Sequence, residues 1–409
     1  MSVALLRRRG VLAAGGGGGA QFAVGSFTAD TSTGTQQFAH GLGTTPKAIF
    51  FFGSGSAAVS GTWDAHVHQV VGFSDGTTSY AVSGASEDAV TTSNTEQRIA
   101  AKCITIISDG EVVIGEADLD SWDDTNITVD WTDAPVTSDE IMFWVVGGEG
   151  VEAKVMNWQS PTSTGNKVID TVGFQPDLVL HATVYAASSI PDSSGYMATG
   201  FGAMDGAGGQ WTNAVAAQAS QSTSNTGRYQ RTDKCISILQ ANGTSLPVNE
   251  EAEFVSMNSG GFTVDFTTAS AGEWNYISLC IKGVNAKVLS VSESGSDTQT
   301  IDTLTFEPSA LLTANTRQAG NSGLVATDAL FGIGAATGDA QRATAQSDRN
   351  GQATTDAESL WKNNRHIIMP EYGSIKAEAS LTSFNADGWT EDWATDPETN
   401  VRYYIALGA

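Results

Sequence analysis

The sequence has few charged residues, only three cysteines and no long apolar run. Charged residues make up 16% of the 409 residues, against roughly 25% in ordinary globular chains. Three cysteines cannot all form disulfides with one another, so we expect a fold that assembles in a reducing cytoplasm. Because no apolar run reaches about 18 residues, the sequence predicts no membrane-spanning helix and no membrane insertion.

Positive charge is also scarce. Lysine and arginine number 20, aspartate and glutamate 45, and the formal net charge is −25. That charge repels phosphate backbones and anionic membrane surfaces, so nucleic acid is not an expected partner. The simplest interpretation is an acidic surface that keeps the protein in solution.

Motifs of catalysis and cofactor binding are missing as well. The sequence contains no Gly-x-x-x-x-Gly-Lys-Ser/Thr, no His-Glu-x-x-His and no Cys-x-x-Cys. Cys103 and Cys235 occupy matching places in a repeat described below, where the third copy has His366. Such substitution favours a packed position over a catalytic thiol, and we expect no enzymatic activity and no cofactor.

What the sequence does contain is a short apolar segment that follows a proline and occurs three times. The prolines are Pro46, Pro176 and Pro308, spaced 130 and then 132 residues apart, and the first precedes the apolar segment 47–52. Similarity at a fixed spacing indicates an internal repeat. Each segment is short and bounded by glycine-rich loops, which predicts a buried strand whose start the proline marks.

The rest of each unit is also rich in strand-forming residues. Short β-branched and aromatic segments alternate with glycine turns, without helical periodicity. The sequence therefore predicts an all-β fold of three tandem antiparallel β-sandwich repeats, jelly-roll-like and about 130 residues each, in a pseudo-threefold arrangement. The expected repeats are 21–150, 151–283 and 284–409, preceded by an arm of residues 1–20.

The arm is basic and rich in glycine. Arg7, Arg8 and Arg9, followed by 11–14, partly match a twin-arginine export signal, but glycines 15–19 replace the apolar segment that such a signal needs. The alternative is a basic arm on a glycine hinge that reaches an acidic partner. We expect the three arginines to be assembly contacts.

One pattern suggests a metal site. Asp64, His66 and His68 alternate on a predicted strand, so their side chains would point to one face. A His-x-His pair can bind zinc, but the other two units have no matching histidines. Polar residues at a surface or interface are the simpler interpretation. The acidic segment 118–124 lacks the glycine of an EF-hand and is expected to be a turn.

Two charged positions recur once in each unit. The first is an acidic residue beside a core aromatic: Asp130, Asp265 and Asp392. The second is an arginine upstream of an apolar strand: Arg98, Arg231 and Arg365. Catalytic acids act in convergent pairs, so we interpret the aspartates as strand-end hydrogen-bond acceptors, with the arginines as candidate ion-pair partners.

The ten tryptophans are expected to lie mostly in the core. Trp63, Trp158 and Trp211 are candidates for loop aromatics that stack on a host-surface glycan, because glycan-binding modules present exposed aromatics beside amides. A glycoside hydrolase would instead need an unrepeated pair of acids in one cleft.

The recurring motifs at 41–52 and 172–179, together with the Ser/Thr/Gly/Asn-rich loops, resemble virion proteins of tailed bacteriophages and related archaeal viruses. The resemblance implies a structural role in a capsid or tail. We therefore expect a non-enzymatic virion structural protein on the particle exterior, tail-associated or capsid-decorating. It would be assembled in the host cytoplasm and docked through its arm to other virion proteins. The alternative is a host-recognition adhesin module that binds glycan.

Overall fold

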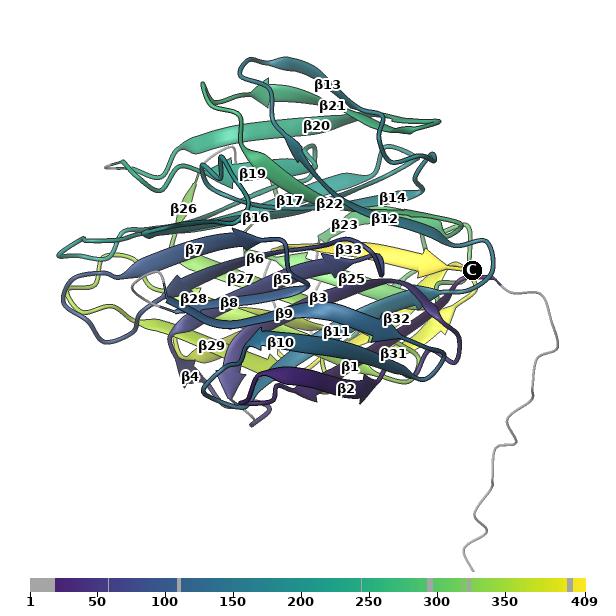
Figure 1. Ribbon diagram of the computed structural model, residues 1–409, viewed down its shortest axis with the longest axis horizontal. Coiled ribbons are helices and arrows are strands. Elements are labelled where there is room, and N and C mark those ends of the chain that lie inside the picture. The colour runs from purple at the N-terminus through teal and green to yellow at the C-terminus, as the bar shows by residue number, and fades with distance from the viewer. Residues whose placement is uncertain are drawn as a thin grey trace, which may run out of the picture.

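The computed structural model describes residues 19–57, 59–108, 112–243, 245–292, 297–318, 320–321, 325–395 and 400–409. Over these residues the protein is built from antiparallel β-sheets (Figure 1). The strands form sheets of seven and sheets of four, and each sheet of seven faces a sheet of four. The predicted all-β sandwich architecture is confirmed.

The same spatial order of strands occurs three times. In unit 1 the larger sheet is β1 (Gln21–Thr28), β11 (Asp139–Gly147), β3 (Pro46–Ala57), β5 (Val67–Ser74), β6 (Ser79–Ser86), β7 (Thr95–Ala100) and β15 (Asp192–Ser194). Its smaller sheet is β2 (Gly34–Ala39), β10 (Asn126–Asp133), β9 (Val112–Trp122) and β8 (Ile104–Ser108).

Units 2 and 3 follow this order. The larger sheet of unit 2 is β12 (Glu152–Gln159), β22 (Asn275–Lys282), β14 (Leu178–Val184), β16 (Tyr196–Asp205), β17 (Gln210–Gln218), β18 (Thr226–Arg231) and β26 (Ala326–Thr327), and the smaller is β13 (Gly165–Ile169), β21 (Gly261–Thr268), β20 (Val248–Asn258) and β19 (Ile236–Leu239). In unit 3 the larger sheet is β23 (Asn285–Ser292), β33 (Val401–Gly408), β25 (Ala310–Asn315), β27 (Ala329–Thr337), β28 (Gln341–Asp348), β29 (Ala357–Lys362) and β4 (Asp64–Ala65), and the smaller is β24 (Asp297–Ile301), β32 (Gly388–Trp393), β31 (Ser374–Asn385) and β30 (Ile367–Glu371).

The apolar segment after Pro46 is the buried strand β3, which begins at the proline. Its side chains alternate between two apolar interiors. Phe50 and Phe52 lie in a cluster at the centre of the molecule, whereas Ile49 and Phe51 lie between the two sheets of unit 1. Because both faces are covered, the segment is apolar throughout instead of alternating with polar residues. The corresponding strands β14 and β25 begin two residues after their prolines.

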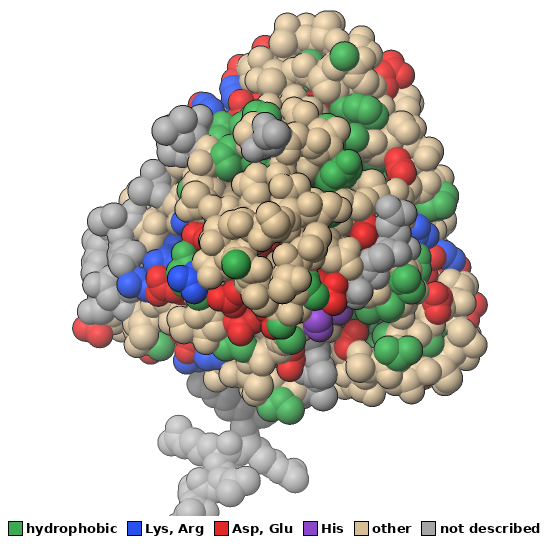
Figure 2. All heavy atoms as spheres, turned by 90° about the vertical axis from the view of Figure 1, so that its left-hand side faces the viewer, with side chains coloured by type: hydrophobic (Ala, Val, Ile, Leu, Met, Phe, Trp, Pro, Cys, Tyr) green, Lys and Arg blue, Asp and Glu red, His purple; other side chains and the backbone are tan. Residues whose placement is uncertain are grey.

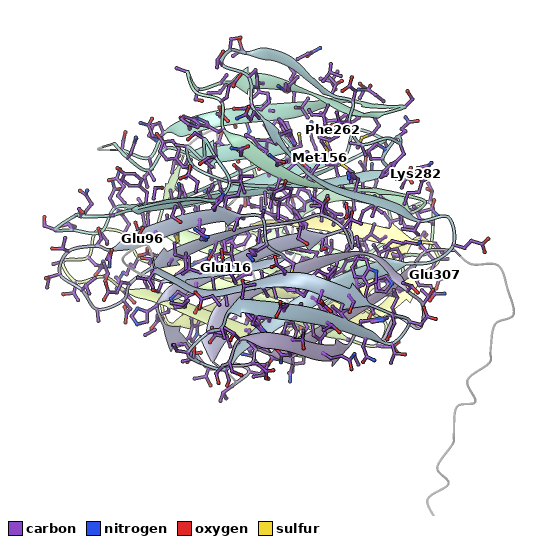
Figure 3. All side chains as sticks on the ribbon, viewed as in Figure 1. Glu96, Glu116, Met156, Phe262, Lys282 and Glu307 are labelled. Carbon is purple, nitrogen blue, oxygen red and sulfur yellow. The ribbon has the colours of Figure 1, made fainter. Side chains whose placement is uncertain are left out.

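The three larger sheets surround one shared core. Rings from different units stack directly in it: the ring centroids of Phe50 and Phe201 are 5.7 Å apart, and those of Trp211 and Tyr403 are 5.3 Å apart. Seen end-on, the molecule has a roughly triangular outline (Figure 2). Each pair of sheets also encloses a core of its own, as Met156 and Phe262 show in unit 2 (Figure 3). The units therefore differ from independent domains on linkers, because they share an interior.

Short strands are exchanged between units in a cycle. β15, from unit 2, extends the larger sheet of unit 1 by pairing with β7. β26, from unit 3, pairs with β18 of unit 2, and β4, from unit 1, pairs with β29 of unit 3. The cycle closes, so each unit both gives and receives one strand.

The joins between units lie at the opposite end of the molecule from these short strands (Figure 1). β11 and β12 are separated by residues 148–151, and β22 and β23 by 283–284. Residues 150 and 151 lie in the first join, and residues 283 and 284 form the second. Gly19 lies against Ala409, since a Cβ built on Gly19 would be 2.8 Å from the Cβ of Ala409. The two ends of the described fold thus meet where a third join would be.

Candidate functional site

Polar contacts outside the sandwich cores gather at the end formed by the loops 87–94, 219–225 and 349–356, which we call the loop face. Its loops connect β6 to β7, β17 to β18 and β28 to β29, one in each unit. Figure 2 shows this end of the molecule, where uncharged side chains and backbone cover most of the surface and charged groups gather in patches.

Each of the three loops contains a buried hydroxyl residue that hydrogen-bonds to the neighbouring unit. These residues, Ser93, Ser224 and Thr355, are spaced 131 residues apart in the sequence. The Ser93 hydroxyl donates to the Gln218 carbonyl at 2.6 Å, and the Ser224 hydroxyl donates to the Arg349 carbonyl at 2.6 Å. In the third loop Thr355 closes the ring, because the Val90 N–H donates to its hydroxyl at 3.0 Å. All three hydroxyl residues are buried. They form one cyclic set of contacts between units.

Backbone hydrogen bonds reinforce each contact between neighbouring units, which we call a seam. The Ser93 N–H donates to the Gln221 carbonyl at 2.9 Å, and the Ser224 N–H donates to the Gln352 carbonyl at 2.9 Å. The Thr355 N–H donates to Val90 O at 2.9 Å. Sequence reasoning missed this ring, although the 131-residue spacing matches that of the prolines.

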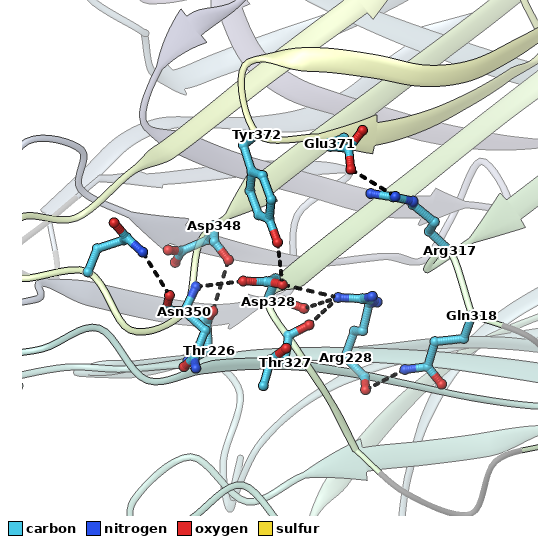
Figure 4. Close-up of polar contacts among 11 residues, drawn as sticks. Thr226, Arg228, Arg317, Gln318, Thr327, Asp328, Asp348, Asn350, Glu371 and Tyr372 are labelled. Carbon is cyan, nitrogen blue, oxygen red and sulfur yellow. Dashed lines mark hydrogen bonds and ion pairs between the residues drawn. The ribbon is translucent and has the colours of Figure 1, made fainter. Parts of the chain in front are cut away.

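The seam between units 2 and 3 is held by charge (Figure 4). The Arg228 guanidinium lies 3.7 Å from an Asp328 carboxylate oxygen, and the Tyr372 hydroxyl donates to the same oxygen at 2.7 Å. Burial and the hydrogen bond to Asp328 raise the pKa of Tyr372 above its ordinary value. Arg317 pairs with Glu371 nearby at 2.9 Å. The Asp328 carboxylate therefore links unit 3 to Arg228 of unit 2.

The seam between units 3 and 1 contains a buried carboxyl group, that of Asp348, whose pKa is raised. Asp348 is buried and accepts one hydrogen bond, from the Ser86 hydroxyl at 2.6 Å. Burial, together with the charges of Asp356, Asp328 and Asp88, raises its pKa to about 7 despite that bond. The carboxyl group is thus close to its titration midpoint at neutral pH.

Asp64, His66 and His68 do not lie on one strand, so the prediction of a continuous strand through them is wrong. The strand is interrupted at His66, between β4 and β5, where the backbone φ is +72°. The rings of His66 and His68 stack at 6.1 Å. Among the described residues no group of three His, Cys, Asp or Glu side chains could hold a metal ion. The His66 ring instead accepts a hydrogen bond from the Asp88 N–H at 3.0 Å.

Two of the three tryptophans proposed for glycan binding are core residues, so that assignment is wrong for Trp158 and Trp211. Trp211 is fully buried and its indole N–H donates to the Tyr404 carbonyl at 3.1 Å. Trp158 stacks on Tyr276 at 5.0 Å, and its indole N–H donates to Ser278. Both rings are covered by protein and cannot stack on a sugar. Trp63 is half-buried against an apolar cluster of unit 3.

The recurring arginines do contact a recurring acid, but it is a different acid from the one predicted. Equivalent glutamates on β9, β20 and β31 accept them: Arg98 pairs with Glu116 at 2.7 Å, Arg231 with Glu251 at 3.6 Å, and Arg365 with Glu378 at 3.0 Å. Asp130 and Asp265 are half-buried and Asp392 is exposed, and within the described part of the chain none of them forms an ion pair.

The remaining sequence candidates have structural roles. The Asp123 carboxylate accepts the N–H groups of Thr125 and Asn126, both at 2.7 Å, so the turn expected in the acidic segment is present at 123–125. Asp118 and Asp120 lie on the strand β9, and for them the expectation of a turn is wrong. Cys103 and Cys235 are buried, and burial raises the pKa of both thiols far above the ordinary value. Arg7, Arg8 and Arg9 lie outside the described residues.

A serine pattern of the kind found at nucleophile elbows also occurs, at 72–76. It closes the hairpin between β5 and β6, whereas an elbow joins a strand to a helix. Ser74 is fully buried, and its hydroxyl oxygen accepts the Gly76 N–H at 3.2 Å. The spacing therefore arises from a β-turn.

An open groove of about 430 Å³ borders the loop face between units 2 and 3. Leu246, Pro247 and Val325 line one part of it, and Asn225 and Asn350 another. In the part of the chain that the structure covers, no helix is long and apolar enough to cross a membrane.

Comparisons with known proteins give no relative. No family model matches the chain, and no curated protein does. One solved structure aligns with it, entitled "Crystal structure of the LG1-3 region of the laminin alpha2 chain", at 8% identity over 95% of this chain and 92% of that one, with a TM-score of 0.10.

Proposed function

We propose that the chain is a non-enzymatic structural protein on the exterior of a tailed virus particle, tail-associated or capsid-decorating. The observation that carries this proposal is the cyclic exchange of β4, β15 and β26, which makes one chain the equivalent of a closed trimer. Most soluble oligomers are homo-oligomers with closed symmetry. A single chain with pseudo-threefold symmetry fits a threefold or sixfold position of a particle.

The distribution of polar groups supports a mechanical role. The three units are joined by buried hydroxyls, backbone hydrogen bonds and ion pairs, and the recurring glutamates neutralise arginines. The motifs at 41–52 and 172–179 contribute buried strands. The features that carry the resemblance to virion proteins thus serve the scaffold.

Docking through the basic arm is part of the proposal. The arm precedes Gly19, which lies at the end of the molecule that carries the joins, opposite the loop face. An arm that holds the protein at that end would leave the loop face pointing away from the particle.

The direct test is mass spectrometry and cryo-electron microscopy of purified particles. We expect the chain as a stoichiometric component at a symmetric position on the exterior. Its absence from particles made in cells that express it would overturn the proposal.

The arm is tested with a variant that lacks residues 1–18, because Ala20 is already buried in the fold. We expect unchanged circular dichroism and loss of incorporation. A matched variant that replaces only Arg7, Arg8 and Arg9 by serine should behave in the same way. Normal incorporation of both variants would remove the arm from the proposal and leave the particle assignment standing.

A host-recognition role is the second candidate. Of the three tryptophans proposed for it, Trp63 retains accessible surface, and the groove beside Asn225 and Asn350 presents amides next to apolar side chains. A glycan array with the isolated chain separates the candidates, since a purely structural protein should give no specific binding.

A further inference from the structure

Unit 1 anchors its loop with an imidazole ring, whereas unit 3 uses a carboxylate at the same place. His66 and Asp328 both follow the exchanged short strand of their unit, and both have a positive φ, +72° and +68°. The Asp88 N–H donates to His66 Nδ1 at 3.0 Å, and the Asn350 N–H donates to Asp328 Oδ1 at 2.8 Å. The two side chains therefore perform the same task.

The backbone around the two residues matches as well. The His66 N–H donates to the Ala357 carbonyl at 2.8 Å, and the Asp328 N–H donates to the Thr226 carbonyl at 3.2 Å. The acceptor in each case belongs to the neighbouring unit. His66 is thus the anchor between β4, the strand that unit 1 gives to unit 3, and the loop 87–94.

The tautomer of His66 follows from its partner. A backbone N–H can only donate, so Nδ1 must carry a lone pair and no proton. A protonated imidazole has N–H groups at both nitrogens and cannot accept. A carboxylate continues to accept at pH values where histidines in general have become protonated. Of these two equivalent anchors, only the one in unit 1 requires an imidazole nitrogen without a proton.

The loop that His66 anchors reaches both other units. Towards unit 3, the Ala89 N–H donates to the Thr355 carbonyl at 3.0 Å, and the Asp88 carboxylate accepts the Ala357 N–H at 3.0 Å. Towards unit 2, the Ser93 hydroxyl donates to the Gln218 carbonyl. Loosening of 87–94 would therefore affect two of the three seams.

We propose that His66 is an acid-sensitive latch: its protonation breaks the hydrogen bond from Asp88 and releases the loop 87–94 from the neighbouring units. The response goes beyond a structural role in a particle, since it makes one face of the protein change with pH. The other titratable groups around the latch are on its own segment, on the loop 87–94, on the loop 349–356 and on the strands β28 and β29. They are Asp64, His68, Asp88, Asp348, Asp356 and Glu358.

The test compares the wild-type protein with His66→Asn at the same pH, so that the intrinsic dependence of amide exchange on pH cancels. Asparagine tolerates a positive φ and offers an acceptor that does not titrate. Hydrogen–deuterium exchange is followed by mass spectrometry in peptides that cover 87–94, with peptides that cover 219–225 as the internal reference.

We expect equal exchange of 87–94 in the two proteins at pH 8. At pH 5 the wild-type segment should exchange about tenfold faster than the same segment of His66→Asn, the size expected for one lost hydrogen bond. His66→Asp, which copies unit 3, should match His66→Asn. His68→Asn should keep the wild-type response.

Two outcomes would overturn the proposal. One is equal exchange of 87–94 in wild type and His66→Asn at pH 5. The other is loss of the response in His68→Asn, which would move the titrating group to the neighbouring ring. Neither outcome depends on whether the protein belongs to a virus particle.

Discussion

Replacing Glu391 by valine should destabilise the protein by about 3–5 kcal/mol, the range for breaking a buried ion pair. Glu391 is fully buried on β32 between the sheets of unit 3. His366 Nε2 lies 3.2 Å from its carboxylate, Arg402 lies 3.8 Å away, and the Tyr404 hydroxyl donates to it at 2.9 Å. The indole N–H groups of Trp389 and Trp393 donate to it at 3.1 and 2.9 Å.

The pKa of Glu391 agrees with that geometry. Burial alone would favour the neutral acid, but the hydrogen bond and charge of His366, followed by Arg402, outweigh it and hold the pKa below the ordinary value. Because the folded pKa is lowered, the stabilisation is present above the unfolded pKa and is lost as pH falls through the folded one. Valine would remove the carboxylate and leave a buried guanidinium without this partner.

Unit 1 provides a matched control, because its equivalent positions are apolar. The sheet registers place Val129 of unit 1 where unit 3 has Glu391. In the same way Cys103 corresponds to His366, Ile127 to Trp389, Ile141 to Arg402 and Phe143 to Tyr404. In unit 1 Gln36 accepts the Trp131 indole N–H at 2.8 Å. Gln299, freed from Arg402, could accept Trp393 in the same way.

We therefore expect the fivefold variant Glu391→Val, His366→Cys, Trp389→Ile, Arg402→Ile and Tyr404→Phe to recover most of the stability that the single change loses. Well-packed apolar residues often replace buried ion pairs at no cost. Urea unfolding followed by tryptophan fluorescence measures both variants. A loss below about 1 kcal/mol for Glu391→Val, or a fivefold variant as unstable as the single one, would refute this reasoning.

Three further predictions concern the seams, the sheets and the joins. Asp348→Asn should change the pH dependence of unfolding by removing the contribution of this carboxyl group. Because its pKa is raised to about 7, the stabilisation from Asp348 is fully present below the unfolded pKa, and up to about 4 kcal/mol of it is lost as pH rises towards 7. An unchanged profile would contradict this. Gly202→Ala should cost about 3 kcal/mol or more, because the new Cβ would collide with the Cys235 carbonyl oxygen, whereas Gly338→Ala, with nothing nearby, should be neutral in the same urea titration. A circular permutant that links Ala409 to Gly19 and opens the chain between the exposed Glu149 and Gly150 should fold with one calorimetric transition; separate transitions for the units would show that the shared core does not couple them.

The sequence was sufficient for the fold class and for the strand after Pro46, because repetition and burial leave strong patterns. Apolar runs buried on both faces, as at Phe50 and Phe51, can be recognised without knowing their partners. The exchange of β4, β15 and β26 could not be predicted, since these strands have two or three residues each and no apolar periodicity.

The candidate residues show the same limit. Arg98 was expected beside Asp130, but the side chain that faces it comes from β9, and register between strands is not visible in one sequence. The burial of Trp158 and Trp211 cannot be predicted from the sequence, because tryptophan occurs both in cores and at exposed binding surfaces. The alternation of Asp64, His66 and His68 suggests a metal site, whereas the position of His66 after an exchanged strand lets its ring accept the Asp88 N–H.

The closed cycle of strands also sets an order of events during synthesis. β4 is made with the first unit, yet its partner β29 spans residues 357–362, close to the end of the sequence. Until those residues leave the ribosome, a nascent chain has an open edge and a part of the central core facing water. The molecule can complete this cycle only after residues 357–362 have been translated, so a chain truncated in the third unit would expose the shared apolar interior of the first two.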